Sequence, residues 1–244
     1  MQTRRIGIIA DIHGNLPAFE AVIAALKAER VETVVCLGDV AATGPHPHEV
    51  LVRLRDLNGP VVMGNADAGL LDANPPPPQD EDARRYGEID HWCAAQLTAA
   101  DVDYLRSFQA TVELPLGGDD RLLGYHGTPH NYHDGIGPFT SNEDLERLLA
   151  GTSAALLAGG HTHSQLFRRF NTSIVMNPGS IGLAYDFPAN AEPFVPARAE
   201  FAILTYGDAF EVSLRRVPYD RQATLRAMFE REMPHAAWWS ANWT

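Results

Sequence analysis

The chain has 244 residues, of which 45% are hydrophobic, and this length supports one large domain or a core with a small insert. Its two cysteines, Cys36 and Cys93, exclude a disulfide framework, and the formal net charge of −12 argues against a basic surface that holds nucleic acid in a stable complex. No apolar run is long enough to span a membrane, and Asp11 interrupts the only segment resembling a signal peptide, so we expect a cytoplasmic protein.

The first 63 residues alternate between two hydrophobic periods. Apolar, β-branched runs predict buried strands, whereas Leu16, Phe19, Val22, Ile23 and Leu26 fall on one helical face. Asn15 is placed to cap that helix, with Pro17 in its first turn. The expected elements are strands at 5–10, 31–37 and 60–63, with helices from residue 16 and over 48–57. This βαβαβ order is typical of helices packed over a parallel sheet.

Four consecutive prolines at 75–78 interrupt the pattern, because neither a helix nor a central strand can cross them. We interpret 74–110 as a helical insert in a single domain that spans residues 1–244. The insert should hold helices over 80–97 and 99–108, and Thr98 and Asp101 are placed like a capping box for the second. The helices could form a lid, but packing against the domain is the preferred interpretation.

The remaining segment predicts further strands and two more helices. Gly117 to Asp120 should turn a hairpin between strands at 111–116 and 121–125. Ser141 should cap a helix over 142–150, and another helix is expected over 220–232. Further strands are expected at 154–158, 165–170, 173–176, 201–206 and 210–217. The tail, with Trp238, Trp239 and Trp243, leaves self-association into a homo-oligomer, packing on its own domain and disorder open.

Metal-ligating side chains follow the ends of five hydrophobic runs. The five segments are Asp11-Ile12-His13, Gly38-Asp39, Gly64-Asn65, His126-Gly127 and Gly160-His161-Thr162-His163. Carboxylate and amide oxygens together with imidazole nitrogens suit Mn, Fe, Co, Ni or Zn better than Mg or Ca. A single cation cannot use all seven side chains, but two cations that share a bridging carboxylate can. Such paired sites hydrolyse phosphorus esters.

A single His or Asp at a strand end is more often structural than functional. Here, however, the ligand-type residues end successive strands, at the sheet edge where α/β proteins form their sites. The neighbouring glycines tolerate the sharp exit from strand to loop and let the main chain approach an ion. Structural roles alone do not explain this pattern, which therefore indicates a metal site.

The order and local context of these blocks resemble those of the calcineurin-like metallophosphoesterase superfamily, closest to its small bacterial and archaeal phosphodiesterase branch. The resemblance covers residues 5–182 and includes Asn177-Pro178-Gly179-Ser180. It implies an α/β fold of two packed mixed β-sheets flanked by helices. It also implies that Asp39 bridges two metals, one held by Asp11, His13 and His163 and the other by Asn65, His126 and His161.

The implied activity is hydrolysis of a small anionic phosphoester, such as a nucleotide, by a phosphodiesterase or phosphatase. Two divalent transition-metal ions, with Mn preferred over Fe, Zn, Co and Ni, would activate a bridging hydroxide. We expect Asp39, Asn65 and His126 to lie at the catalytic centre, and we expect no membrane partner. A dinucleoside polyphosphate hydrolase, a protein phosphatase and a metal-binding scaffold without activity remain as alternatives.

One departure from the superfamily concerns the proton for the leaving group. Phosphoprotein phosphatases carry a His directly after the Asn of the Gly-Asn block, but this chain has Ala66, which transfers no proton. Other candidate acids, expected in loops that overlook the metals, are His46, His48, His130 and His133, and His133 is preferred. Asp67 could orient the loop or a neighbouring ligand, or it could stabilise a turn. Tyr185, Asp186 and Arg198 are further candidates for substrate contact.

Overall fold

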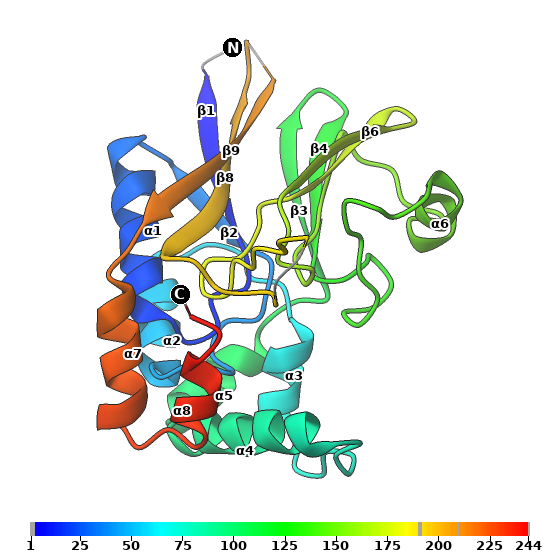
Figure 1. Cartoon of the computed structure of the whole chain (residues 1–244). Coiled ribbons are helices and arrows are strands. Elements are labelled where there is room, and N and C mark those ends of the chain that lie inside the picture. The colour runs from blue at the N-terminus through cyan, green and yellow to red at the C-terminus, as the bar shows by residue number, and fades with distance from the viewer. Residues whose placement is uncertain (1–2, 190–191, 209, 244) are drawn as a thin grey trace.

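Two β-sheets packed face to face form the centre of the molecule (Figure 1). The computed structural model describes residues 3–189, 192–208 and 210–243. The first sheet has the spatial order β2 (Thr33–Cys36), β1 (Arg4–Ile9), β8 (Arg198–Tyr206), β9 (Glu211–Pro218). The second has the order β3 (Thr111–Gly117), β4 (Asp120–Tyr125), β5 (Leu156–Ala158), β7 (Ser173–Asn177), β6 (Leu166–Phe170). The fold is therefore mixed α/β, as the family resemblance implied.

Both sheets combine parallel and antiparallel pairs. In the first sheet β1 is parallel to β2, as the βαβαβ pattern predicted, but it is antiparallel to β8. In the second sheet β4, β5 and β7 run parallel, while β3 and β6 form antiparallel edges. Because β1, β2, β4 and β5 belong to the parallel pairs, the loops that follow them leave each sheet at its carboxyl edge.

Alternation along β1 explains how the two sheets pack. Ile6 and Ile8 lie in the core between the sheets with Leu122 and Leu156 of the second sheet, whereas Ile9 joins the core beneath the helices. Successive strand residues point to opposite faces, so a strand covered on both faces is apolar throughout. This burial on both faces accounts for the continuous hydrophobic run at the start of the chain.

Helices cover the outer faces and the lower end of the sheets in Figure 1. The helices near the first sheet are α1 (Leu16–Ala28), α2 (Pro47–Asp56) and α7 (Arg221–Glu230), and α6 (Asn142–Leu148) lies beyond the second sheet. At the lower end lie α3 (Asn65–Leu71), α4 (Glu81–Ala95), α5 (Ala99–Arg106) and α8 (Ala236–Ser240). The predicted caps are present, since Asn15, Thr98 and Ser141 each accept a backbone N–H three residues later.

Two local predictions need correction. Residues 60–63 form isolated bridges to Cys36 and Gln109 and no strand, because Gly59 and Gly64 bound a segment too short for a ladder. Conversely, α3 was not predicted, since its seven residues carry no helical apolar period and only Asp67 is buried.

The C-terminal tail packs on its own chain. Trp239 and Trp243 are buried with Ile89 and Cys93 of α4, and Tyr86 of α4 contacts the rings of Trp238 and Trp239 edge-on. Of the three alternatives for the tail, the structure thus shows intramolecular packing of α8 against α4.

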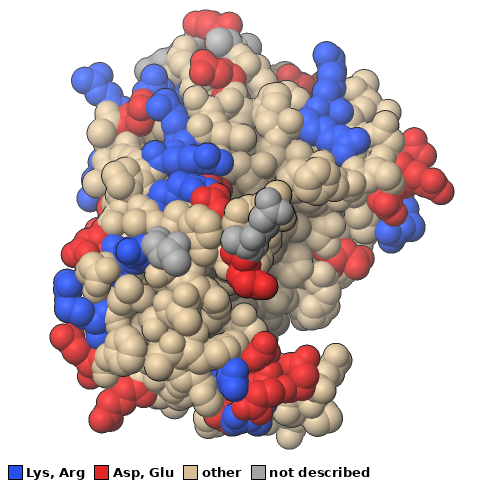
Figure 2. All heavy atoms as spheres, viewed as in Figure 1, with Lys and Arg blue, Asp and Glu red and all other residues tan. Residues whose placement is uncertain are grey.

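On the face in Figure 2, basic and acidic side chains are interspersed and large areas carry no charge. The acidic residues on this face therefore do not form one continuous patch. In the described part of the chain, no helix combines the length and the apolar character needed to cross a bilayer.

Candidate metal centre

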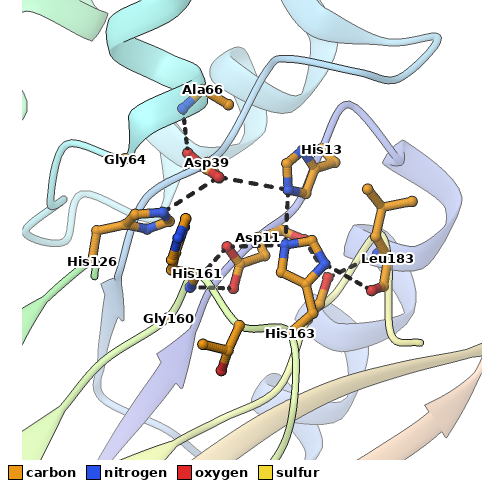
Figure 3. Close-up of polar contacts among 12 residues, drawn as sticks. Asp11, His13, Asp39, Gly64, Ala66, His126, Gly160, His161, His163 and Leu183 are labelled. Atoms are coloured by element: carbon orange, nitrogen blue, oxygen red, sulfur yellow. Dashed lines mark hydrogen bonds and ion pairs between the residues drawn. The ribbon is translucent and has the colours of Figure 1, made fainter. Parts of the chain in front are cut away.

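The seven predicted ligand side chains converge at the carboxyl edge shared by the two sheets. Asp11 and His13 follow β1, Asp39 follows β2, and Asn65 begins α3. The second sheet supplies His126 after β4, and both His161 and His163 after β5. Figure 3 shows the carboxylates and imidazoles of six of these residues directed toward one another. The folded chain therefore brings together the side chains that the sequence grouped, although they span more than 150 positions of the chain.

One cluster consists of Asp11, His13, Asp39 and His163, with one donor atom from each within 4.8 Å of the others. His13 Nε2 lies 3.2 Å from His163 Nε2 and 3.7 Å from Asp39 Oδ2. His163 Nε2 lies 3.5 Å from Asp11 Oδ1. Four facing donors of this kind match the nitrogen and oxygen ligands that divalent transition metals take.

A second cluster consists of Asp39, His126 and His161, again within 4.8 Å. His126 Nε2 lies 3.3 Å from Asp39 Oδ2 and 2.9 Å from Asn65 Oδ1, which adds the amide oxygen of Asn65 to this group. Asp39 belongs to both clusters, and it is the only residue shared between these two groups.

Five of the seven side chains leave a backbone with positive φ. The φ angles are 55° at Asp11, 45° at His13, 55° at Asp39, 69° at His161 and 55° at His163. Left-handed turns, and not the alternation of a strand, therefore bring Asp11 and His13 together. Such conformations cost about 1–3 kcal/mol each and persist where the surrounding structure enforces them, which is typical of functional sites.

Three of the imidazoles have a hydrogen-bond partner at Nδ1, the ring nitrogen that faces away from the cluster. Nδ1 of His126 lies 2.7 Å from the carbonyl of Leu37, and Nδ1 of His163 lies 2.9 Å from that of Leu183. Nδ1 of His13 instead meets a hydroxyl, Thr43 Oγ1, at 2.7 Å. When Nδ1 donates its proton, Nε2 keeps a lone pair directed at the cluster, as metal ligation requires.

Burial and neighbouring charges set the protonation of the cluster. Burial lowers the pKa of His163 to about 3 and also lowers the pKa of His13, which favours the neutral form of both rings. Burial acts in the same direction on His126, but the adjacent Asp39 carboxylate outweighs it and raises the pKa of His126 to about 9. Burial raises the pKa of Asp11. Bound dications would compensate these buried carboxylates and compete with the His126 proton.

Asp67 holds the loop that carries Asp39 in place through hydrogen bonds. Its carboxylate accepts the backbone N–H groups of Asp39 at 2.7 Å, Val40 at 2.8 Å and Gly64 at 3.2 Å. Burial, with the nearby Asp39 carboxylate, raises the pKa of Asp67 to about 6. Of the roles left open by the sequence, the hydrogen bonds show that Asp67 orients this loop and joins it to the start of α3.

The segment Asn177 to Ser180 forms hydrogen bonds to the loops that follow β1 and β5. Asn177 Nδ2 donates to the carbonyl of Gly160 at 2.6 Å and to Thr162 Oγ1 at 3.2 Å. Ser180 Oγ donates to the carbonyl of Asp11 at 2.8 Å. This segment therefore shapes the site through the backbone of Gly160 and Asp11.

The four candidate acids differ in their surroundings. His48 lies in α2 and not in a loop, and its Nδ1 pairs with Asp101 at 2.7 Å. His130 Nε2 faces the carbonyl of Ala150 at 3.0 Å, and burial beside Arg231 lowers the pKa of His46. His133 is exposed; burial lowers the pKa of His161, and the backbone of His133 acts in the opposite direction. His133 is thus the candidate acid whose backbone influences the pKa of a predicted ligand.

The other residues proposed for substrate contact are engaged within the chain. Arg198 forms a bidentate ion pair with Asp186, at 2.8 and 2.6 Å, and also binds Glu200. Tyr185 stacks on the ring of His163, with centroids 5.9 Å apart. Sequence reasoning missed Thr43, which the distance to His13 reveals, because no motif singles it out.

Comparison with known proteins agrees with this fold. The family model for the calcineurin-like phosphoesterase superfamily domain matches residues 5–205. A metallophosphoesterase from Sphaerobacter thermophilus is similar in structure, with a TM-score of 0.76, 26% identity and coverage of 99% of this chain and 100% of that one.

Two archaeal proteins are also similar. A hypothetical protein from Pyrococcus horikoshii has a TM-score of 0.77 at 23% identity, covering 94% of each chain. An uncharacterized protein from Methanocaldococcus jannaschii is 24% identical over 237 residues, which is 94% of this chain and 93% of that one. Since the family model covers most of the sequence, the chain belongs to the calcineurin-like phosphoesterase superfamily.

Proposed function

We propose that this protein is a phosphodiesterase or phosphatase that hydrolyses a small anionic phosphoester, nucleotides included, with two divalent metal ions. Membership of the superfamily implies phosphoester hydrolysis with divalent metals. The observation that carries the dinuclear proposal is the position of Asp39, whose carboxylate belongs to both donor clusters. A shared carboxylate is what a pair of adjacent dications requires, and two separate mononuclear sites would have no use for it.

The donor set fits such a pair. Asp11, His13 and His163 would hold one ion, Asn65, His126 and His161 the other, and Asp39 both. The mixture of imidazole and oxygen donors favours manganese, with iron, zinc, cobalt and nickel as alternatives. When bound, the ions would supply an activated water nucleophile and stabilise negative charge on the phosphoryl oxygens.

The protein side chains contribute position, charge and protons. Asn65 provides an oxygen without adding a negative charge beside an anionic substrate. Backbone and hydroxyl partners hold the imidazoles of His13, His126 and His163 in fixed orientations, which lowers the cost of organising the site during the reaction. We assign protonation of the leaving group to His133, because Ala66 occupies the position of the usual acid.

The geometry favours an enzyme over a metal-binding scaffold. A scaffold needs no set of seven donors held by strained, mostly buried turns. Hydrolysis of dinucleoside polyphosphates and of phosphoproteins uses the same metal chemistry, so substrates distinguish these alternatives. Assays with nucleotides, cyclic nucleotides, dinucleoside polyphosphates and phosphopeptides would identify the preferred class. A cytoplasmic location remains a prediction from the sequence.

The direct test is hydrolysis of bis-p-nitrophenyl phosphate by metal-free protein with and without added Mn²⁺. We expect release of p-nitrophenol only with the metal, and binding of two ions per chain. Asp39→Asn should abolish turnover and weaken binding of both ions, because it removes the charge that both clusters share. A variant with nearly unchanged rate, or a wild-type protein that stays inert with excess manganese, would contradict the proposal.

A further inference from the structure

Thr43 differs from the other groups that hold the imidazoles of the candidate metal centre. His126 and His163 present Nδ1 to backbone carbonyls. Among these three rings, His13 alone is paired with a side-chain hydroxyl, at 2.7 Å. The orientation of His13 therefore depends on the conformation of one threonine.

That conformation is unfavourable for threonine. Thr43 has a φ of 64°, in the left-handed region that β-branched residues rarely occupy. The residue is buried, so solvent does not satisfy its polar groups. A strained residue of this kind keeps its geometry only where its surroundings enforce it.

The enforcing contacts come from two helices distant in sequence. Asp90 of α4 accepts the N–H of Thr43 at 2.9 Å, and the indole Nε1 of Trp239 in α8 donates to its carbonyl at 3.0 Å. Cys93 of α4 donates to the next carbonyl, that of Gly44, at 3.4 Å. With the hydroxyl on His13, each of the three polar groups of Thr43 has a partner from a different segment.

We propose that Thr43 is a positioning residue for the ion held by Asp11, His13 and His163, and that α4 and α8 maintain it through Asp90 and Trp239. The helical insert and the C-terminal helix thereby set the affinity of one of the two metal sites. The same contacts do not reach Asn65, His126 or His161. This inference rests on the proposed metal centre, and it extends that proposal to residues outside the ligand set.

The test is titration of the metal-free protein with Mn²⁺ by calorimetry, with His163→Ala and His161→Ala used to assign the two binding events. Thr43→Val keeps the shape of the side chain but removes the hydroxyl, so it should weaken the event lost in His163→Ala by about tenfold. The event lost in His161→Ala should not change. Thr43→Ser keeps the hydroxyl and should restore wild-type binding.

The chain offers a matched pair for α8. Trp239→Phe removes the indole N–H that binds Thr43 and should weaken the same event. Trp243→Phe makes the same change at a buried tryptophan whose Nε1 has no hydrogen-bond partner among the described residues, so it should leave both events unchanged. Thermal unfolding of each metal-free variant measures any general loss of stability, so that this loss can be separated from the effect on metal binding.

The inference would be overturned if Thr43→Val bound both ions with wild-type affinity, or if it weakened both binding events equally. It would also be overturned if Trp239→Phe and Trp243→Phe had equal effects on metal binding. Two bound ions without phosphoester turnover would contradict the proposed function and leave the positioning role standing. A wild-type protein that binds no Mn²⁺ would overturn both.

Discussion

His133 is the side chain on which the proposed proton transfer depends. It lies exposed in the loop after β4, next to His161. A poor leaving group needs a proton in the transition state, whereas p-nitrophenolate leaves without one. We therefore expect His133→Ala to slow hydrolysis of an alkyl phosphoester by about 10²-fold or more, and that of a p-nitrophenyl ester far less.

His130→Ala is the matched control for this experiment. His130 lies three positions earlier in the same loop, but its ring is bound to the carbonyl of Ala150. Its loss should affect both esters little. Equal losses on the two esters in His133→Ala would assign the residue to folding or binding and leave the acid unidentified.

For individual residues, the sequence predicted the candidate metal ligands but not the residues that position them. Asp11, Asp39 and His126 could be recognised because each follows an apolar run beside a glycine or a second ligand type. Thr43 could not, because its partners lie at positions 13, 90 and 239 and only the folded chain brings them together. Left-handed turns at the ligands were also missed, since Asp and His carry no local signal for positive φ comparable to that of glycine.

Among the elements, α3 connects local backbone geometry to the metal centre. It begins at Asn65, directly after Gly64, and a Cβ added to Gly64 would lie 2.1 Å from Asp39 Oδ1. We expect Gly64→Ala to displace Asp39, and so to weaken binding of both ions and to lower the free energy of unfolding. Metal titration and urea unfolding measure the two effects.

Gly69 in the same helix provides the opposite case. A Cβ there would meet nothing within 4 Å, so Gly69→Ala should stabilise α3 by about 0.5–1 kcal/mol through reduced backbone entropy of the unfolded chain. Metal affinity should stay at the wild-type value. Similar behaviour of the two glycine variants would show that contact with Asp39 is not what Gly64 preserves.

Helices could be predicted where a capping residue or a long hydrophobic period marked them. The helix α1 has five apolar residues on one face and an Asn15 cap, and its predicted start agrees with the structure. By contrast, α3 is short and polar, and the bridge at Val61 and Val62 depends on pairing with Cys36 and Gln109. Such segments form through tertiary contacts, and the spacing of hydrophobic residues in the sequence does not reveal those contacts.

For the molecule as a whole, the candidate metal centre forms only where the two sheets pack together. The first cluster takes Asp11 and His13 from the first sheet and His163 from the second, while the other combines Asp39 with His126 and His161. Sheet pairing was implied by the family resemblance and not by the hydrophobic pattern, which does not reveal which strands are antiparallel. The separation of the two sheets should therefore control the spacing of both donor sets.

Leu122 and Leu157 allow this dependence to be measured. Both are buried leucines on neighbouring parallel strands of the second sheet, but Leu122 lies in the core between the sheets and Leu157 in the outer core with Leu145 and Leu148 of α6. Replacing either with Ala should lower the free energy of unfolding by about 2–5 kcal/mol, as loss of a buried leucine leaves a cavity. Only Leu122→Ala should also weaken Mn²⁺ binding, because its cavity lies between the sheets and lets them shift relative to each other. Urea unfolding and Mn²⁺ titration under conditions where both variants are folded would test this, and equal affinities in the two variants would mean that loop contacts alone hold the donors in place.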